Sequence, residues 1–394
     1  MVDKIFNNFN LFDGINNQIV PNSYMVVDPN GLIKSIGHNY HGSNHNHVDL
    51  NDKYVIPGLI NVHTHTTMSP DIRANNVDPG PVAATVRSIK HLHQLLKSGV
   101  TTIREVGSLY DIDIYLSKLV VNGQLDKSPE IIPSGKAFSM TGGHGDSPHG
   151  GHAVDSCDEM RKGVRTALKK GAKNIKMMAT GGVTTPGDSM FDPQLSIPEM
   201  HTAVIEAHHK GLTACAHAQA NPGIMNAIKA GVDSVEHGCF VNDTNINLML
   251  KKGTYLTCTL MPGYVIQQHG SQNIPKYEYQ KNARIMEEFF KHIAYAFHRG
   301  VKISLGTDAG SPFNTFDLTA KELELMASLP GVSNFDALST INNSAHLLKL
   351  GNKVGSIKSG HLANFLVLNH NPLKDIKAVQ QKDKSVYKDG VKEY

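Results

Sequence analysis

The feature that most constrains the fold is a pattern repeated through the middle of the chain. An amphipathic segment ends at a glycine, and a short apolar or β-branched run follows. The runs, such as VTTIREVG, LTACAHA and VKISLGT, have the length of a buried strand. Because glycine adopts the left-handed conformation after a helix without steric cost, each site predicts a helix end, a turn and a strand. The glycines are Gly99, Gly171, Gly211, Gly231, Gly253 and Gly300.

Two further runs, YVIPGLINVHTH near residue 60 and EIIPSGKAF near residue 134, bring the predicted strands to eight. Ser196 and Glu199 have the spacing of a capping box before one of the helical segments. Strands that alternate with helices predict a parallel sheet, and eight such units favour an α/β fold of the TIM-like (β/α)8 barrel type. An open doubly wound sheet is the alternative, but it would need a glycine-rich motif after the first strand, which the sequence lacks.

The two ends of the chain do not follow this pattern. Residues 1–57 and 355–394 contain short extended runs with Pro-Asn-Gly and Asp-Gly turns, which predict β-hairpins. Neither end is long enough to bury a core alone. We therefore expect the two ends to pair into one small β-sandwich domain, beside a barrel domain formed by residues 58–354.

Composition and charge exclude several classes of function. Of the 394 residues 40% are hydrophobic, and 38 Lys and Arg against 35 Asp and Glu leave a net charge of +3. No long run of one charge occurs, so neither a nucleic acid nor a membrane surface is an expected partner. No apolar run suits a signal peptide or a membrane span, and the cysteines occur singly, which favours a soluble cytoplasmic protein. A homo-oligomer is left open. The cysteines are Cys157, Cys215, Cys239 and Cys258.

Histidine, with 22 copies, is the unusual residue of this composition. His63 and His65 lie two apart at the end of the first predicted strand, so their side chains point to the same face. A single histidine there would usually be a satisfied core residue, but a His-x-His pair favours a shared metal ion. Other metal-competent side chains recur at the matching depth of later strands, which in a barrel is the carboxyl-terminal mouth, where active sites are built. These residues are Lys176, His217, His237 and Asp308.

Lys176 needs a separate argument, because an ammonium group would be repelled by a metal ion. A desolvated lysine loses its proton easily, and the free amine can react with carbon dioxide to give a carbamate, which is a bridging anion. The alternative is an ordinary lysine paired to a carboxylate. The metal-competent residues predicted around Lys176 favour the carbamate.

The motifs VxHxHT, IKxMATGG, AHA, EHG and GTDA resemble those of the amidohydrolase superfamily, and the resemblance covers nearly the whole chain, including a split β-sandwich. IKMMATGGV is similar to the branch of Xaa-Pro dipeptidases and L-amino-acid carboxypeptidases, whose members are often described as imidazolonepropionase-like. The resemblance implies a buried metal ion on His63 and His65, an exposed one on His217 and His237, and a carboxylated Lys176 between them.

The resemblance also implies that Asp308 ligates the buried ion, acts as general base on the bridging water and then gives the proton to the leaving nitrogen. Two divalent metal ions would lower the pKa of that water and polarise the scissile carbonyl. Zinc suits these ligands, although manganese, cobalt or iron could also bind them.

Several residues are candidates for substrate contact. The loop TGGHGDSPHGGH after the third strand brings His144, His149 and His152 over the mouth of the barrel. By the resemblance, His144 contacts the scissile carbonyl or the substrate carboxylate, whereas a flexible loop explains the other two equally well. Gln219 in the motif AHAQ and Tyr264 just past the seventh strand are further candidates. Relatives carry Tyr or His at the position of Gln219, which leaves the substrate preference open.

A second group of histidines lies in the N-terminal part of the chain, within GHNYHGSNHNH. It is surrounded by Asn and Gly, and we expect a solvated loop there rather than a metal site. The group comprises His38, His41, His45 and His47.

The sequence therefore predicts a binuclear metal-dependent amide hydrolase, specifically a dipeptidase or carboxypeptidase that releases a C-terminal Pro or apolar amino acid. The alternative within enzymes is hydrolysis of a cyclic or aryl amide, such as an imidazolone, an N-acyl amino acid or a toxin amide. Relatives that act on imidazolones lack the bridging lysine, so Lys176 argues against that substrate. A catalytically silent binding barrel is the alternative of another class, and the full set of predicted ligands disfavours it.

Overall fold

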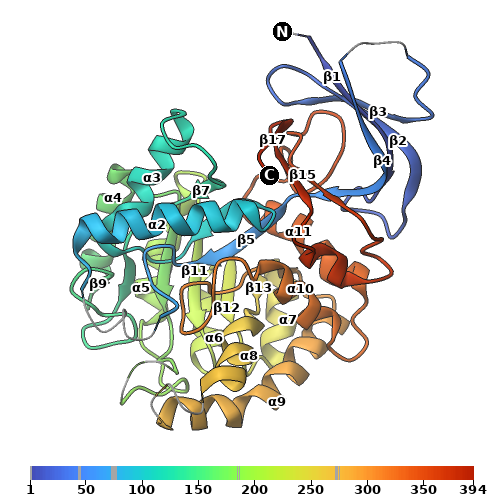
Figure 1. The fold of residues 1–394 in the computed structure, drawn as a ribbon. Coiled ribbons are helices and arrows are strands. Elements are labelled where there is room, and N and C mark those ends of the chain that lie inside the picture. The colour runs from blue at the N-terminus through green and yellow to red at the C-terminus, as the bar shows by residue number, and fades with distance from the viewer. Residues whose placement is uncertain are drawn as a thin grey trace.

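The computed structural model comprises two bodies (Figure 1), a larger one of strands enclosed by helices and a smaller sheet that carries both chain ends. No helix within the described ranges is both long and apolar enough to cross a membrane. His45 of the N-terminal histidine group lies outside the described residues. The structure describes residues 2–42, 46–71, 78–183, 185, 187–270, 274 and 276–394.

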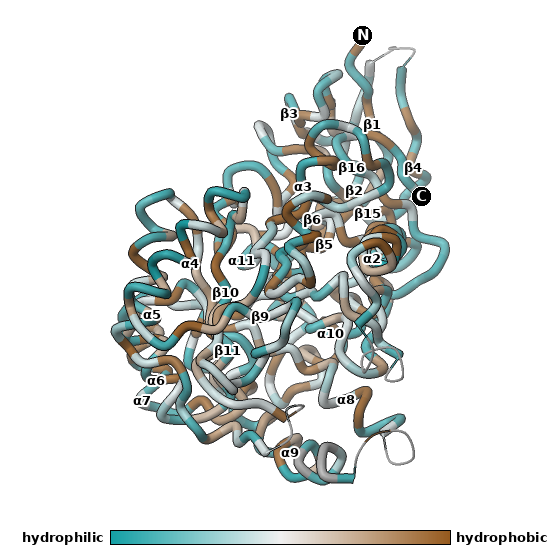
Figure 2. Tube along the Cα trace, turned by 90° about the vertical axis from the view of Figure 1, so that its left-hand side faces the viewer, coloured by the Kyte–Doolittle hydropathy of each residue, from teal (hydrophilic) through white to brown (hydrophobic). Residues whose placement is uncertain are grey.

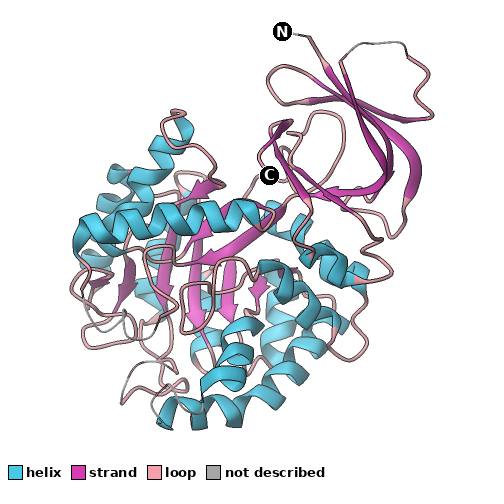
Figure 3. Cartoon of the chain, viewed as in Figure 1, coloured by secondary structure: helices cyan, strands magenta, loops and turns pink. Residues whose placement is uncertain are grey.

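The larger body is the predicted (β/α)8 barrel, with parallel strands inside and helices outside (Figure 3). Its strands form two hydrogen-bonded sheets, in the orders β5-β6-β7 and β14-β13-β12-β11-β10-β8-β9. The strands are β5 (Leu59–Thr64), β6 (Val100–Glu105), β7 (Glu130–Ile132), β8 (Ala137–Ser139), β9 (Gly151–Ala153), β10 (Asn174–Met178), β11 (Thr213–Ala218), β12 (Ser234–His237), β13 (Tyr255–Thr257) and β14 (Ile303–Ser304).

Backbone hydrogen bonds join the two sheets on both sides. Val62 N in β5 donates to Leu305 O just after β14, at 2.8 Å. Lys173 N, just before β10, donates to Pro133 O at the end of β7, also at 2.8 Å. These contacts close the ring of parallel strands, so the carboxyl ends of all of them open at one mouth.

The third strand of the barrel differs from its prediction. The run EIIPSGKAF was expected to be continuous, but it is divided into β7 and β8 by residues 133–136. Pro133 has no amide hydrogen to continue the ladder, and Gly135 has a left-handed backbone with φ 69°. The interruption turns the chain at the mouth, directly before the loop that carries His144.

The helices cover the outside of the barrel and end as the sequence predicts. Gly171, Gly231 and Gly253 are left-handed caps of three of them. The capping box is also confirmed, because Ser196 N donates to Glu199 Oε2 at 2.8 Å. The helices are α2 (Gly80–Lys97), α3 (Ile112–Val121), α4 (Cys157–Lys170), α5 (Ile197–His208), α6 (Gly223–Ala230), α7 (Asp243–Lys252), α8 (Leu260–His269), α9 (Lys276–His298), α10 (Thr319–Ala327) and α11 (Asn334–Leu347), with short 3-10 turns η1 (Leu109–Asp111) and η3 (Ile376–Gln380).

The smaller body is one seven-stranded sheet to which both chain ends contribute, in the order β17-β16-β15-β4-β1-β2-β3. Its central contact pairs β4 with β15, with Pro57 opposite Phe365. The rings of Phe6, Phe365 and Tyr387 pack against one another in its separate core. The strands are β1 (Lys4–Leu11), β2 (Val20–Val27), β3 (Ile33–His38), β4 (His47–Pro57), β15 (Phe365–Leu368), β16 (Ser385–Lys388) and β17 (Val391–Lys392).

This sheet is the predicted β-sandwich of both ends, with one difference in topology. The hairpins β1-β2, β2-β3, β15-β16 and β16-β17 are antiparallel, but β4 leaves the hairpin series and pairs with β1 in parallel. β4 then runs through Gly58 directly into β5, the first strand of the barrel. Figure 2 shows hydrophobic stretches along β5 and β6, both of which are buried throughout their length. The domain boundaries at residues 57 and 355 stay a prediction.

Candidate functional site

Three predicted metal ligands lie together at the carboxyl ends of β5 and β14. His63 and His65 stand at the end of β5, and Asp308 follows β14 with a left-handed backbone of φ 56°. The Nε2 atoms of His63 and His65 lie 3.5 and 3.2 Å from Asp308 Oδ1. Donor atoms of the three residues all lie within 4.8 Å of one another. Such a group of two imidazoles and one carboxylate could hold a divalent metal ion.

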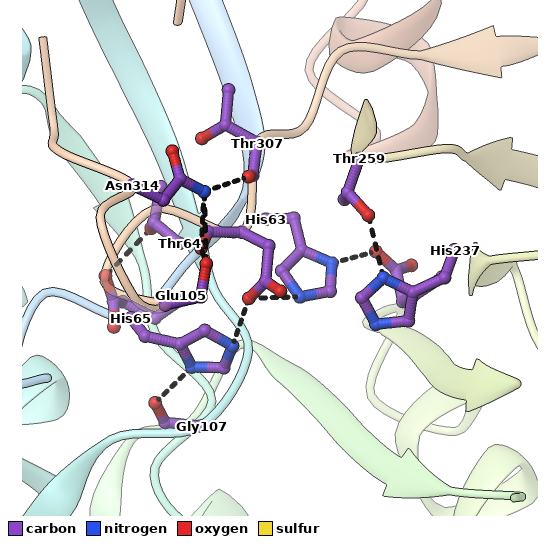
Figure 4. A network of polar contacts seen from close by, with 12 residues as sticks. His63, Thr64, His65, Glu105, Gly107, His237, Thr259, Thr307 and Asn314 are labelled. Carbon is purple, nitrogen blue, oxygen red and sulfur yellow. Dashed lines mark hydrogen bonds and ion pairs between the residues drawn. The ribbon is translucent and has the colours of Figure 1, made fainter. Parts of the chain in front are cut away.

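Each of these two histidines is anchored through Nδ1, whereas its Nε2 is the nitrogen next to Asp308. His63 Nδ1 lies 2.7 Å from Glu236 Oε2. His65 Nδ1 lies 3.0 Å from Gly107 O (Figure 4). With acceptors at Nδ1, each ring donates its proton there, and Nε2 faces Asp308. His63 Nε2 is buried and has no hydrogen-bond partner within the described residues. This unpaired nitrogen beside a carboxylate fits a cation at that point.

The carboxylate of Asp308 is suited to such a cation because it is ionised. Burial acts to raise the pKa of Asp308, but His63 and His65 outweigh burial and hold it well below the usual value. The backbone that follows β14 is fixed by Asn314, whose amide donates to Asp308 O at 2.9 Å. The position of the carboxylate is therefore set by the loop as well as by the two rings.

His217 and His237 lie next to the first group, at the ends of β11 and β12. Their ring centroids are 4.6 Å apart, and the ring of His237 is 5.0 Å from that of His63. His237 Nδ1 contacts Thr259 Oγ1 at 2.7 Å, and His217 Nε2 contacts Gly181 O at 3.1 Å. Burial lowers the pKa of both imidazoles well below the usual value. Both rings are therefore neutral, and each keeps one ring nitrogen for a further ligand.

Lys176 lies in the middle of β10, opposite Cys215 of β11 in the register of the two strands. Its side chain is buried, with the residue 1% exposed. In the part of the chain that the structure describes, its amine has neither a hydrogen-bond nor an ion-pair partner. Burial lowers the pKa of Lys176. A lysine without a paired carboxylate is the form that can lose its proton and react as an amine.

Two residues behind the histidines were not singled out from the sequence. Glu236 and Arg104 are both fully buried, and Arg104 Nη2 donates to Glu236 Oε1 at 2.8 Å. Arg104 also donates to Ser234 Oγ at 3.1 Å and to Val62 O at 2.6 Å. Burial acts to raise the pKa of Glu236, but Arg104 and His63 lower it, so the group stays a carboxylate. The available signal was an ionisable residue inside each of two buried runs, REVG and VEHG.

Glu105 is another buried carboxylate that sequence reasoning missed. It accepts a hydrogen bond from Thr64 Oγ1 at 2.8 Å (Figure 4). It accepts a second one from Thr66 N at 3.1 Å. Burial, with a smaller contribution from Asp113, raises its pKa well above the usual value. Glu105 thereby holds the chain on both sides of His65, through the Thr64 hydroxyl and the Thr66 amide.

Among the three loop histidines, His144 lies against the cluster. Its ring centroid is 4.4 Å from that of His217. Its Nδ1 lies 2.8 Å from Thr185 Oγ1 and 3.8 Å from Asp188 Oδ2. Burial lowers the pKa of His144 to about 4, so the ring is neutral near pH 7. A neutral imidazole at this place can form a hydrogen bond to a bound substrate.

The other two loop histidines make different contacts. His149 Nε2 lies 3.1 Å from Asp78 Oδ2, and its ring stacks on Tyr110 with centroids 4.5 Å apart. The ring of His152 packs against Phe138 at 5.2 Å. These contacts hold the loop to its neighbours, and neither ring contacts the histidine cluster among the described residues.

The two remaining substrate candidates also differ. Gln219 follows β11, and its Oε1 is buried without a hydrogen-bond partner among the residues described. Its backbone oxygen accepts from Phe240 N at 2.8 Å, which fixes the chain there. Tyr264 lies on α8, where the Lys321 ammonium is 5.3 Å from its ring. Gln219 thus offers an unused acceptor two residues after His217, whereas Tyr264 has no hydrogen bond to the cluster in the described part of the chain.

A parallel barrel with histidines, an aspartate and a buried lysine at its carboxyl mouth is typical of metal-dependent hydrolases. The family model described as "Amidohydrolase family" matches residues 54–392, and the chain belongs to that family.

Known relatives agree with this assignment. A solved structure of a Xaa-Pro dipeptidase with bound methionine in the active site superposes with a TM-score of 0.92, at 30% identity, over 99% of each chain. Ochratoxinase of Aspergillus niger is 28% identical over 359 residues, which cover 83% of this chain and 72% of ochratoxinase. Imidazolonepropionase of Erwinia tasmaniensis is 24% identical, over 82% of this chain and 80% of its own. The protein is a hydrolase that acts on C–N bonds.

Proposed function

We propose that the protein is a binuclear metal-dependent dipeptidase or carboxypeptidase that releases a C-terminal Pro or apolar amino acid. The observation that carries the proposal is the gathering of imidazoles, one carboxylate and one buried unpaired lysine at the mouth of the barrel. The similarity to a Xaa-Pro dipeptidase over the whole chain supports a peptide substrate. The four cysteines are free thiols, which is consistent with a cytoplasmic location.

The residues present fit two divalent ions, which we propose to be zinc. When bound, the ions would activate a water molecule and polarise the scissile carbonyl. The Lys176 amine would add carbon dioxide and lose a proton, and the resulting carbamate would supply oxygens toward both ions. The first ion would be held by His63, His65 and Asp308, and the second by His217 and His237.

The side chains of the site divide the chemical work. Asp308, an ionised carboxylate, accepts the proton of the attacking water and delivers it to the leaving nitrogen. The neutral ring of His144 contacts the substrate carbonyl or carboxylate. The unpaired Oε1 of Gln219 accepts a hydrogen bond from a substrate N–H group. We keep Tyr264 as a candidate for contact at the rim.

A second substrate class is favoured by one comparison. The similarity to ochratoxinase supports an aryl amide, such as a toxin amide or an N-acyl amino acid. The similarity to imidazolonepropionase is lower, and the unpaired Lys176 argues against an imidazolone. A silent binding barrel is disfavoured, because every predicted ligand of the metal ions is present in the chain.

A dipeptide library tests the proposal. The zinc-loaded protein is incubated with dipeptides that carry Pro, Met, Leu, Phe, Asp or Lys at the C-terminus, and free amino acids are measured. We expect release of Pro or apolar residues by the wild-type protein. Asp308→Asn should lower kcat by at least about 1000-fold, because the proton acceptor is lost, while zinc stays bound.

Two outcomes of this library would contradict the proposal. Cleavage of aryl amides but of no dipeptide would show that the substrate is an aryl amide rather than a peptide. Full activity of the Asp308→Asn protein would exclude the proposed role of this carboxylate.

A further inference from the structure

We propose that Glu236 is a positioning residue, which holds His63 in the tautomer that can bind a cation through Nε2. The inference rests on the proposed function in one respect, since it needs a metal ion at His63. It concerns Glu236 and Arg104, which contact a proposed metal ligand but are not themselves proposed ligands.

The contact between Glu236 and His63 is closed to water. Both side chains are 0% exposed, and Nδ1 and Oε2 lie 2.7 Å apart. The other oxygen of Glu236 accepts from Arg104 and from Ser234 Oγ. Oε2 is thus left to His63, and a carboxylate oxygen there requires the proton on Nδ1. The lone pair of Nε2 then faces Asp308, and this is the nitrogen without a partner among the described residues.

Arg104 prevents Glu236 from turning away. Its guanidinium extends from β6 to contact β5 through Val62 O and β12 through Ser234 and Glu236. A guanidinium keeps its protons at every physiological pH, so Arg104 always needs a hydrogen-bond acceptor, and Glu236 Oε1 is that acceptor. The planar fork therefore fixes both the place and the rotation of the carboxylate.

The same carboxylate also connects the two parts of the predicted metal centre. Successive residues of a strand point to opposite faces, so Glu236 and His237 would ordinarily diverge. His237 has a left-handed backbone, with φ 72°, and its ring nevertheless lies beside that of His63. Glu236 contacts the His63 ring, and the His237 ring lies 5.0 Å from it. Glu236 and His237, adjacent in β12, therefore both lie next to the His63 ring.

Glu236→Gln separates this role from simple packing, because the amide has nearly the same shape. One terminal oxygen becomes an NH2 group. Because Arg104 can only donate hydrogen bonds, the remaining oxygen must face Arg104. The NH2 group then faces His63 Nδ1, which must become an acceptor, and the ring proton moves to Nε2. In this tautomer Nε2 has no lone pair for a metal ion.

The experiment measures zinc rather than turnover. Wild-type and variant proteins are loaded with zinc, dialysed, and analysed for metal content, and zinc release to a chromogenic chelator is timed. We expect Glu236→Gln to release zinc about 10- to 100-fold faster, in the range known for residues behind metal ligands. Glu322→Gln is the matched control, because Glu322 is equally buried but accepts from Leu260 N and Met261 N. It should release zinc at the wild-type rate.

A double-mutant cycle tests whether the effect passes through His63. In a His63→Ala background, Glu236→Gln should change zinc release by less than about 2-fold. An equal acceleration in both backgrounds, or wild-type release by Glu236→Gln, would overturn the proposal. If Glu236→Gln fails to fold, Ser234→Ala removes only one donor to the carboxylate and should speed release by about 3-fold. Unchanged release by Ser234→Ala would then overturn the proposal.

These outcomes are distinct from failure of the proposed function. If the wild-type protein retains zinc but cleaves no dipeptide, the proposed substrate is wrong and the proposed role of Glu236 is unaffected. A protein that retains no zinc would remove both.

Discussion

Lys176 is the residue whose chemistry depends most on its surroundings, because burial favours its neutral amine and no carboxylate among the described residues pairs with it. We predict that Lys176→Ala loses zinc and activity together. Short carboxylic acids should restore part of both, because their oxygens can replace a carbamate. Zinc content and kcat/KM are measured with and without added acetate or propionate.

Lys384 provides a matched control for this prediction. It is also largely buried, with a pKa lowered to about 8 by burial, but its amine donates to Val379 O and Gln381 O. Lys384→Ala should lower stability and keep zinc. A Lys176→Ala protein with wild-type zinc and activity would refute the carbamate.

His91 gives a prediction about pH. Its Nδ1 donates to Thr66 O at 2.8 Å, its ring stacks on Phe316, and burial lowers its pKa to about 4. Because the unfolded chain takes up this proton near pH 6.5, the stabilising contribution is present above that pH and is lost as pH falls toward 4. The shift corresponds to about 3 kcal/mol of unfolding free energy.

Urea denaturation at pH 7.5 and pH 4.5 measures this loss. His91→Gln keeps a donor for Thr66 O but cannot titrate, so its stability should fall less between the two pH values. An identical fall in both proteins would show that His91 does not contribute to acid sensitivity.

At the scale of elements, the segment directly after β14 lies so close to β5 that only glycine fits at position 306. A β-carbon there would lie 2.8 Å from His63 Cβ and would also meet Thr257. We predict that Gly306→Ala displaces His63, lowers stability by about 1–3 kcal/mol and weakens zinc binding. Chemical denaturation and zinc content are the measurements.

Gly300 supplies the comparison for Gly306. It has a left-handed backbone with φ 78°, but a β-carbon would meet nothing within 4 Å. Gly300→Ala should therefore cost stability through backbone strain alone and leave zinc bound. Loss of zinc in this variant as well would show that the close contact at Gly306 is not the cause.

The elements themselves could largely be predicted from the sequence, because helix-ending glycines and β-branched runs act locally. The side chains behind the site could not. Arg104 and Glu236 meet only after β6 and β12 have closed into one ring, and nothing local in either run indicates this contact. The break between β7 and β8 was not predicted, because EIIPSGKAF was expected to form one continuous strand despite Pro133 and Gly135. The parallel contact of β4 with β1 is likewise a property of the folded chain.

At the scale of the whole molecule, the proposed ligands come from five separate strands, β5, β10, β11, β12 and β14. We predict that bound zinc stabilises the entire barrel, because the unfolded chain does not gather these groups. At free zinc 100 times its dissociation constant, one site adds about 2.7 kcal/mol. Scanning calorimetry with and without a chelator measures the change in Tm.

Adding zinc back to the chelated protein should return the Tm to the value of the zinc-loaded protein. The Asp308→Asn protein should respond to chelation as well, since it keeps most of the ligands. An unchanged Tm after complete removal of zinc would show that the ions do not couple the strands.

The pairing of β4 with β15 has a consequence for biosynthesis. As the nascent chain leaves the ribosome, β4 emerges early, whereas Phe365, its partner opposite Pro57, is translated only after the whole barrel. Until then one edge of β4 exposes unpaired amide and carbonyl groups, which can add strands from other molecules. Stalled or prematurely terminated translation would leave this edge of β4 permanently unpaired. Chaperones that cover the edge during synthesis should therefore matter more for this chain than for a barrel without the added sheet.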